Sequence, residues 1–406
     1  MPQINVGDTA FVLISAALVC LMTPGLAFFY GGLVRKKNVL TIMMQSFISM
    51  GIVTMIWIFG GFSLAFGRDI HGLIGSLQYF GLKGVGMAPH PSYGSTIPFL
   101  SFFTYQEMFA VITPALITGA FADRINFKSY LKFLVIWSVL IYIPVCHWMW
   151  GGGFLQKMGA VDFAGGIVVH VTAGMAALAS VFFVGKRKIL PEESTAPHNI
   201  AFVALGTGLL WFGWFGFNGG SALSANGIAA TAFINTDIAG SVAMVAWLLI
   251  SWKHEKKPTL VGALTGSVAG LATITPAAGY VRPWAAVIIG ILAAAVCYLC
   301  VQIRIKMEWD DALDVWGVHG VGGILGSILV GVFAESSVNG VSGLVFGNFH
   351  QFGVQIFAVA LTGAFAFVIT WAILKVLDTF APVRVSEKAE IEGLDASLHG
   401  ETAYDF

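Results

Sequence analysis

The feature that most constrains this chain is a series of eleven long apolar runs. Each is near the ~20 residues that an α-helix needs to cross a bilayer. Hydrophobic residues make up 57% of the 406 and charged residues only 10%, whereas a soluble domain carries roughly 25% charged residues. We therefore predict an all-α integral membrane protein with eleven transmembrane helices. They cover residues 8–34, 39–66, 98–122, 130–150, 162–184, 199–217, 237–252, 258–278, 284–302, 315–333 and 352–377.

The basic residues predict how these spans are oriented in the cell membrane. An odd number of crossings puts the two termini on opposite sides, and loops rich in Lys and Arg remain in the cytoplasm. We expect the N-terminus outside and the C-terminus inside. The loops assigned to the cytoplasm hold Arg35, Lys36, Lys37, Arg124, Lys128, Lys132, Lys186, Arg187, Lys188, Lys253, Lys256, Lys257, Arg304 and Lys306; the opposite loops hold Arg68, Lys83, Lys157 and Arg282. The net charge of zero gives no field that favours nucleic acid as a partner.

Two pairs of similar runs indicate an internal repeat. Residues 29–32 (Phe-Tyr-Gly-Gly) end the first span, and residues 217–220 (Phe-Asn-Gly-Gly) end the sixth. Residues 162–170 and 314–319 each lead from an aspartate through glycine to a histidine. A repeat of five spans has inverted topology, as in transporters with a site between two halves. The sequence therefore predicts an inverted 5+5 repeat plus one long final helix.

The composition changes at residue 381, which divides the chain into two parts. Residues 1–380 form the predicted transmembrane domain, and residues 381–406 form a polar, acidic tail with a few apolar positions. We interpret the tail as a cytoplasmic regulatory or docking segment.

His170 and His319 are the main candidate site residues. At 1.5 Å per residue, His170 lies about 12 Å from Asp162, and His319 lies about 7 to 13 Å inside, depending on whether its helix begins at Asp314 or Asp310. A single buried histidine is usually structural, but two at matching places in inverted repeats favour a pore or binding site. Neutral imidazoles in contact alternate as donor and acceptor and can relay hydrogen bonds or a proton. For Asp162 we favour a structural role as an N-cap over direct ligation of a cation.

Aromatic residues gather in the outer half of the predicted spans. Tyr105 and Phe109 are four residues apart and share one helix face, Trp150 ends the fourth span, and Phe217 ends the sixth with Ser221 just beyond. Most aromatics in such a chain belong to an interfacial belt, but Phe109 lies too deep for one. A cation can bind over such ring faces.

Glu107 is an unusual acid inside the third span. It is two positions from both Tyr105 and Phe109, about 200° around the helix, so it should face away from the pore towards a neighbouring helix or subunit. A paired or protonated structural carboxylate is the expected role.

Enzymatic function is not predicted. The sequence has no nucleophile–base motif, phosphate loop or metal-ligand spacing, so we expect no catalytic residues, no metal and no cofactor. One alternative is a membrane haem protein with His170 and His319 as axial ligands, although each helix offers only one histidine. A Soret band in the purified protein would identify that class.

These motifs together resemble the ammonium transporter family (Amt/Mep, related to the Rhesus glycoproteins), from about Gly7 into the tail. Trp150 and Ser221 favour the Amt branch over the Rhesus branch, and the tail resembles the bacterial and archaeal form of that branch. The motifs are Thr23-Pro24-Gly25, residues 29–35 (FYGGLVR), residues 148–153 (WMWGGG), residues 162–170, residues 211–218 (WFGWFGFN), Thr275-Pro276-Ala277 and residues 310–319.

The resemblance implies a homotrimer in the bilayer, with one narrow pore in each subunit. It assigns substrate recruitment to Phe109, Trp150 and Ser221, with Asp162 as an essential acid nearby. Tyr105 belongs to the same recruitment site; it stands where phenylalanine is common and would add a hydroxyl near the vestibule. It assigns the gate to Phe109 and Phe217, and the twin pore histidines to His170 and His319. The tail segments 392–395 and 399–404 resemble the form that supports coupling between subunits and binding of a cytoplasmic PII-type signalling protein.

The expected function is ammonium transport, with methylammonium as an analogue. A narrow apolar pore penalises the charged form, so ammonium would lose a proton near the phenyl rings and cross as ammonia. Potassium cannot lose its charge in this way. Whether the proton follows through the histidines remains open at this level. A further alternative is an ammonium sensor that signals through its tail.

Overall fold

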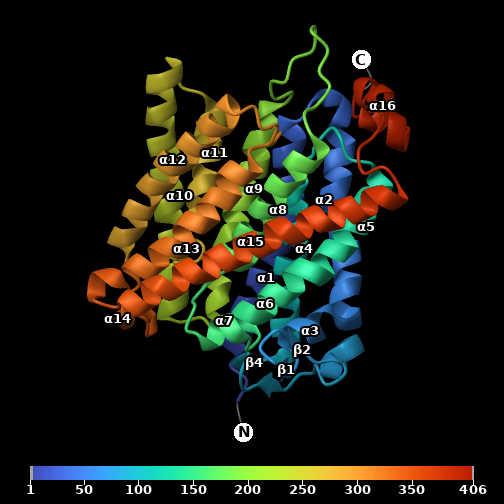
Figure 1. Cartoon of the computed structure of the whole chain (residues 1–406). Coiled ribbons are helices and arrows are strands. Elements are labelled where there is room, and N and C mark those ends of the chain that lie inside the picture. Colours follow the sequence, from blue (N-terminus) through green and yellow to red (C-terminus); the bar gives the residue numbers. More distant parts are fainter. Residues whose placement is uncertain (1–2, 405–406) are drawn as a thin grey trace.

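The computed structural model describes residues 3–404 as a bundle of long helices (Figure 1). The long helices are α1 (Val6–Leu33), α2 (Val39–Ile56), α4 (Phe99–Ile117), α5 (Phe127–Trp137), α8 (Thr172–Val184), α9 (Ile200–Gly219), α10 (Gly227–Glu255), α11 (Leu260–Ile274), α12 (Pro283–Lys306), α13 (Val321–Phe333) and α15 (Phe349–Phe380). The shorter elements are α3 (Phe62–Phe66), α6 (Ile143–Trp150), α7 (Phe154–Lys157), α14 (Ser336–Asn339), α16 (Glu387–Glu392), and the strands β1 (Asp69–Ile70), β2 (Ile74–Gly75), β3 (Pro89–His90) and β4 (Gly94–Pro98).

The predicted multi-pass membrane architecture is confirmed. Within residues 3–404, ten helical segments are long and apolar enough to cross a membrane, and α11 is apolar but only 15 residues long. The eighth span was expected to continue to residue 278, but α11 ends at Ile274. Pro276 explains this end because proline has no N–H and its ring clashes with the carbonyl four residues before it.

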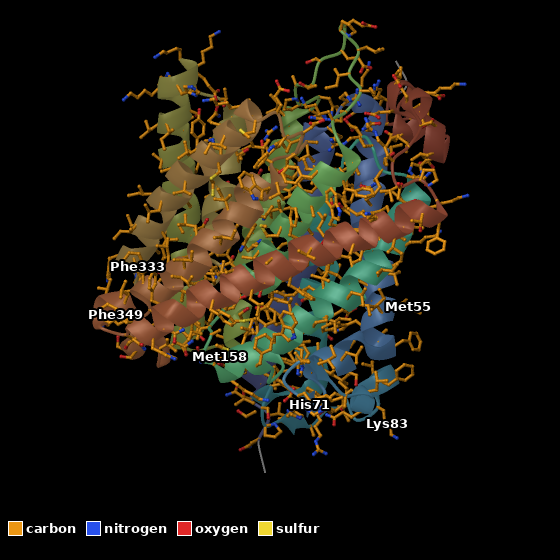
Figure 2. All side chains as sticks on the ribbon, in the orientation of Figure 1. Met55, His71, Lys83, Met158, Phe333 and Phe349 are labelled. Carbon is orange, nitrogen blue, oxygen red and sulfur yellow. The ribbon has the colours of Figure 1, made fainter. Side chains whose placement is uncertain are left out.

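The surface of the bundle matches a lipid environment. Apolar side chains such as Met55 (54% exposed) project from its sides, whereas Lys83 and His71 lie at one end (Figure 2). The N-terminus lies at that end and the C-terminus at the opposite end (Figure 1). We call these ends the N-terminal face and the C-terminal face. Helix α15 crosses the bundle obliquely (Figure 1), because its 32 residues measure about 48 Å and exceed a hydrocarbon core of about 30 Å.

Two features depart from uninterrupted membrane helices. The N-terminal face carries two small antiparallel sheets, β1–β2 and β3–β4, which the span pattern did not predict. Several spans also contain π-helical turns: η2 (Trp57–Gly61), η4 (Ser138–Tyr142), η5 (Gly166–Val171) and η7 (Trp316–Gly320). Such turns occur frequently at functional sites, and η5 and η7 contain His170 and His319.

The tail folds against the C-terminal face. Asp395 accepts hydrogen bonds from the first backbone N–H groups of α2, at 3.0 Å from Leu40 and 2.8 Å from Thr41. Leu394 N–H donates to Asn38 at 2.8 Å, and Lys37 donates to the Ile391 carbonyl at 2.6 Å. The tail therefore binds to the loop between the first two spans, and to the start of α2, through these hydrogen bonds.

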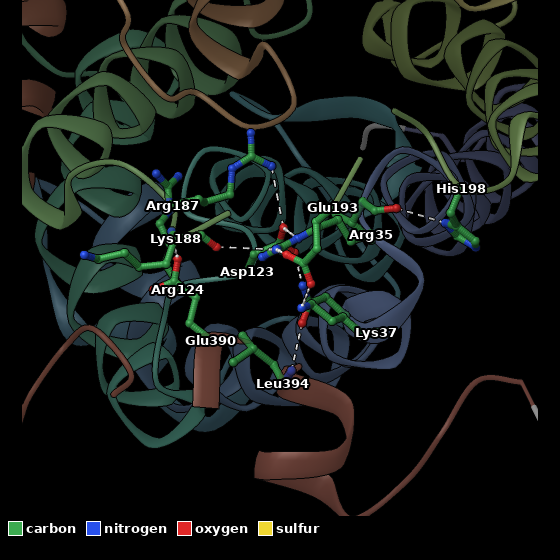
Figure 3. Close-up of polar contacts among 12 residues, drawn as sticks. Arg35, Lys37, Asp123, Arg124, Arg187, Lys188, Glu193, His198, Glu390 and Leu394 are labelled. Atoms are coloured by element: carbon green, nitrogen blue, oxygen red, sulfur yellow. Dashed lines mark hydrogen bonds and ion pairs between the residues drawn. The ribbon is translucent and has the colours of Figure 1, made fainter. Parts of the chain in front are cut away.

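A second set of contacts joins the tail to the loop between α8 and α9 (Figure 3). Glu390 is buried, pairs with Arg384 at 2.8 Å and accepts a hydrogen bond from Lys188 N–H. Glu193 of the same loop pairs with Arg35 at 2.7 Å and also with Lys37. Hydrogen bonds connect the tail to both loops, and ion pairs connect the first loop to the 185–199 loop.

Candidate functional site

Asp162 organises the start of the fifth span. Its Oδ1 accepts hydrogen bonds from Gly165 N–H (2.9 Å) and Gly166 N–H (2.6 Å), and its Oδ2 accepts from Ile167 N–H (2.7 Å) and Val168 N–H (3.0 Å). A helix start leaves four such N–H groups without partners, and one carboxylate supplies about four acceptor sites. The helical turn begins at Gly166, later than the predicted residue 162, but the capping role is as expected. No acceptor site remains for a cation.

The two candidate histidines meet in the middle of the bundle. Their Nδ1 atoms are 3.3 Å apart, their ring centroids are 5.3 Å apart, and the rings are nearly parallel at 18°. Both side chains are buried. The two acid-to-histidine runs therefore bring both imidazoles to one place in the structure. In this structure the two rings are in direct contact, with no space for a macrocycle between them.

Reciprocal glycine contacts bring the two histidine helices together. A Cβ atom on Gly174 would lie 2.0 Å from Gly320 Cα, and one on Gly323 would lie 2.8 Å from the Gly166 carbonyl oxygen. Gly174 and Gly323 each follow a histidine by four residues. The two helices therefore approach closely at Gly166, Gly320 and Gly323, and larger residues there would separate the rings.

Aromatic rings form a column that leads to the histidines. The centroids of Trp150 and Phe109 are 5.9 Å apart, those of Phe109 and Phe217 are 4.3 Å apart, and those of Phe217 and His170 are 6.2 Å apart. The two phenylalanines are tilted by 35°. Both are almost fully buried (1% exposed), so the column is closed at this point.

Three cavities follow this column through the protein. The outer cavity, at the N-terminal face, has a lining that includes Phe102, Gln106, Phe109, Trp150, Asp162 and Ser221. The central cavity lies beside Phe217, Trp214, His170 and His319. The inner cavity, at the C-terminal face, includes Tyr30, Pro197, Asp314 and His319. The phenylalanine pair separates the first two cavities, and His319 borders the last two.

The sequence had suggested that the Tyr105 hydroxyl lies near the outer cavity, but the structure does not place it in the cavity lining. Its ring is fully buried and its hydroxyl donates to the carbonyl oxygens of Gly216 (2.9 Å) and Phe217 (2.7 Å). The Tyr105 hydroxyl oxygen also lies 3.2 Å from Ser221 Oγ. Tyr105 is not part of the cavity lining, so it supports Ser221 and Phe217 from outside the cavity.

Glu107 faces away from the ring column, as predicted. Thr54 of α2 donates a hydrogen bond to its carboxylate at 2.6 Å, and Glu107 is absent from the linings of all three cavities.

The acid that matches Asp162 in the second acid-to-histidine run is Asp311, whereas the sequence pattern had suggested Asp314. Asp162 and Asp311 each precede their histidine by eight residues, and Asp311 accepts Trp316 N–H at 2.7 Å. Burial raises the pKa of Asp311 to about 6, and the charge of Asp314 acts in the same direction. Asp314 instead has a positive φ of 56° and pairs with Arg304.

Two residues of the site were not singled out from the sequence. Trp214 stacks on His170 with centroids 5.6 Å apart and donates a hydrogen bond to Thr275 at 2.9 Å. Gln106 lines the outer cavity beside Phe109. Helical spacing could have identified both residues, because Trp214 and Gln106 each lie three residues before a predicted gate phenylalanine and so share its helix face.

Comparison with known proteins places this architecture in one family. The profile of the Ammonium Transporter Family matches residues 10–404. The ammonium transporter of Bacillus subtilis is 48% identical over 98% of this chain and 99% of its own length. The crystal structure of Candida albicans Mep2 superposes with a TM-score of 0.88 at 36% identity, over 95% of this chain and 88% of that one. A structure described as a sensor Amt protein gives 0.89 at 30% identity, over 97% and 98%. The chain is therefore a member of the ammonium transporter family.

Proposed function

We propose that this protein carries ammonium across the cell membrane through the ring column. Ammonium is recruited in the outer cavity, loses a proton at the phenylalanine pair and crosses the central cavity as ammonia. The observation that carries this proposal is the continuous series of rings from Trp150 through Phe109 and Phe217 to the paired histidines. It joins a cation-binding environment directly to an apolar passage.

The outer cavity suits a small cation. Trp150 and Phe109 present aromatic surface, which attracts cations, and the Ser221 hydroxyl lies on the same lining. Trp150 Nε1 donates to the Asp162 carbonyl at 2.8 Å, so the indole is held in place by the loop that Asp162 caps. Asp162 thus serves recruitment as a positioning residue.

The phenylalanine pair favours loss of the proton. Transfer from water into a closed apolar passage disfavours the charged form and lowers the effective pKa of ammonium. Ammonia then meets His170 and His319. With Nδ1 facing Nδ1, one ring donates and the other accepts, and His170 Nε2 has no protein partner within residues 3–404. That nitrogen is available to a passing molecule.

The direction of the pore follows from the charges at its ends. Arg35, Arg124 and Arg187 lie in the ion-pair network of the C-terminal face, and basic loops favour the cytoplasm. We therefore assign the N-terminal face to the outside, the C-terminal face to the cytoplasm, and eleven crossings to the membrane domain of residues 1–380.

A homotrimer with one pore per subunit is consistent with an unpaired acid on α10. Asp237 is half-buried and lies ten residues into the helix, and it has no hydrogen-bond or ion-pair partner within the described chain. A carboxylate at this depth is costly in lipid. A neighbouring subunit that covers this face of α10 would remove the exposure.

The docked tail supports a regulatory role for residues 381–406. Its contacts with Lys37 and Lys188 join it to the loops around the inner cavity, where a cytoplasmic PII-type protein would act. A second candidate function is ammonium sensing, because a sensor Amt protein shares this fold. Covalent chemistry is not part of the proposal.

Reconstitution into liposomes distinguishes transport from sensing. An inward ammonium gradient should produce uptake well above that of protein-free vesicles, followed with an internal pH dye and with labelled methylammonium. A sensor would bind ammonium and alter tail exposure to protease without accelerating uptake. Binding without flux would therefore contradict the transport proposal.

A further inference from the structure

Gln106 is a polar side chain of the outer cavity that the protein itself leaves unpaired. It projects from α4 into the lining and is only 9% exposed. Its Oε1 is buried without a hydrogen-bond partner, and no bond to its Nε2 is formed within residues 3–404. Buried polar groups are nearly always hydrogen-bonded, so a free amide here indicates a missing ligand.

The position of Gln106 on α4 places it among the recruiting rings. Phe102 lies four residues before it and Phe109 three residues after it, so all three share one helix face and line the same cavity. The amide therefore sits between two aromatic surfaces, next to the entrance of the closed passage.

The other polar groups assigned to recruitment are already engaged by the protein. The Asp162 carboxylate accepts four backbone N–H groups, and Trp150 Nε1 donates to the Asp162 carbonyl. Ser221 Oγ donates to the Phe217 carbonyl at 2.9 Å. The Ser221 hydroxyl oxygen can still accept a hydrogen bond, but both carboxylate oxygens of Asp162 are already occupied.

We propose that the Gln106 amide is a specificity-determining residue that accepts an N–H of ammonium in the outer cavity. This inference rests on the transport function proposed above. The terminal amide torsion is broad and roughly two-fold, so the amide can turn its oxygen towards the cation. Ammonium carries four N–H donors. Each can point at a separate acceptor: the aromatic ring faces, the serine oxygen and the amide oxygen. Potassium has no donors and instead needs many oxygens to replace its hydration shell.

Replacing Gln106 with leucine tests this role in proteoliposomes. Q106L should raise the apparent KM for ammonium about tenfold, the usual effect of losing a hydrogen bond to a charged group. The maximal rate should stay close to wild type, because the ring column and histidines are unchanged. Preference for ammonium over methylammonium should shrink, since methylammonium has one donor fewer.

Two further variants separate this role from simple packing. Met108→Leu, on the other side of the same helix, should leave KM and the preference unchanged. Gln106→Glu keeps the shape and adds a negative charge, so potassium should become a competitor of uptake.

The outcomes are distinguishable from failure of transport itself. If wild type transports ammonium and Q106L has the same KM and the same preference, the inference is wrong while the transport proposal stands. If Q106L does not accumulate in membranes, Q106E alone tests the inference. Absence of potassium competition in Q106E would then overturn it. If wild type itself shows no uptake, the transport proposal fails first.

Discussion

Replacing Asp162 with asparagine is expected to abolish most ammonium uptake. The amide keeps one acceptor oxygen for two of the four N–H groups at residues 165–168. Its NH2 group then faces the remaining two donors. Each buried N–H left unpaired costs about 1–3 kcal/mol, so the start of the fifth span loses roughly 2–6 kcal/mol and Trp150 loses its anchoring loop.

Uptake into proteoliposomes and thermal unfolding of the detergent-solubilised protein check this prediction together. The matched control is Asp8→Asn, because the Asp8 carboxylate accepts a single N–H from Ala225 at 2.9 Å and an asparagine oxygen can replace it. D8N should transport like wild type. Wild-type uptake and wild-type unfolding temperature in D162N would show that the cap is dispensable.

Substitution of the histidines is expected to change both rate and ion selectivity. His170→Leu removes the imidazole hydrogen bonds from the central cavity and should slow ammonium uptake about tenfold, in line with the loss of one hydrogen bond. His319→Glu introduces a carboxylate that stabilises a cation beside His170. Potassium should then enter a passage that excludes it in the wild type.

Parallel measurements of ammonium and potassium flux in the same vesicles decide this prediction. His350→Gln provides the control, since His350 is exposed at the start of α15. Both pore variants must still reach the membrane as folded protein. If H170L and H319E keep wild-type rates and still exclude potassium, the twin histidines have no role in conduction.

The long helices were predictable because membrane spans have a strong and simple signal. A run of apolar residues in lipid must satisfy its backbone internally and forms a helix, so α1 and α15 begin and end within about three residues of the predicted spans. Helix α10 ends near the predicted residue 252 but begins at Gly227, before the predicted residue 237. Helix ends were less predictable. The fifth span begins four residues later than expected because Asp162 caps it from a preceding loop, and α11 ends before Pro276.

The π-helical turns and the small sheets could not be read from hydropathy. A π turn changes the helical register by one residue without changing composition. The direction in which the His170 and His319 side chains point therefore could not be predicted from helical periodicity. The same limit applies to the second repeat. Three nearby aspartates compete there, and only the structure separates the capping Asp311 from Asp314, which pairs with Arg304.

The candidate site was predictable in its rings and histidines but not in its polar details. His170 and His319 come together as the repeat suggested, and Phe109 and Phe217 lie together as the family resemblance implied. The direction of the Tyr105 hydroxyl depends on a carbonyl of another helix, which one-dimensional spacing cannot supply. The proposed role of Gln106 rests on its buried Oε1 having no hydrogen-bond partner within residues 3–404, which is a property of the folded protein.

Cation flux through the wild-type protein tests the central claim most directly. The claim is that the substrate must lose its charge before it passes Phe109 and Phe217. Proteoliposomes held at an inside-negative potential should take up ammonium and methylammonium rapidly, while potassium uptake stays at the level of protein-free vesicles. Potassium flux through the wild type at a rate comparable to that of ammonium would contradict the claim, because a potassium ion has no proton to lose.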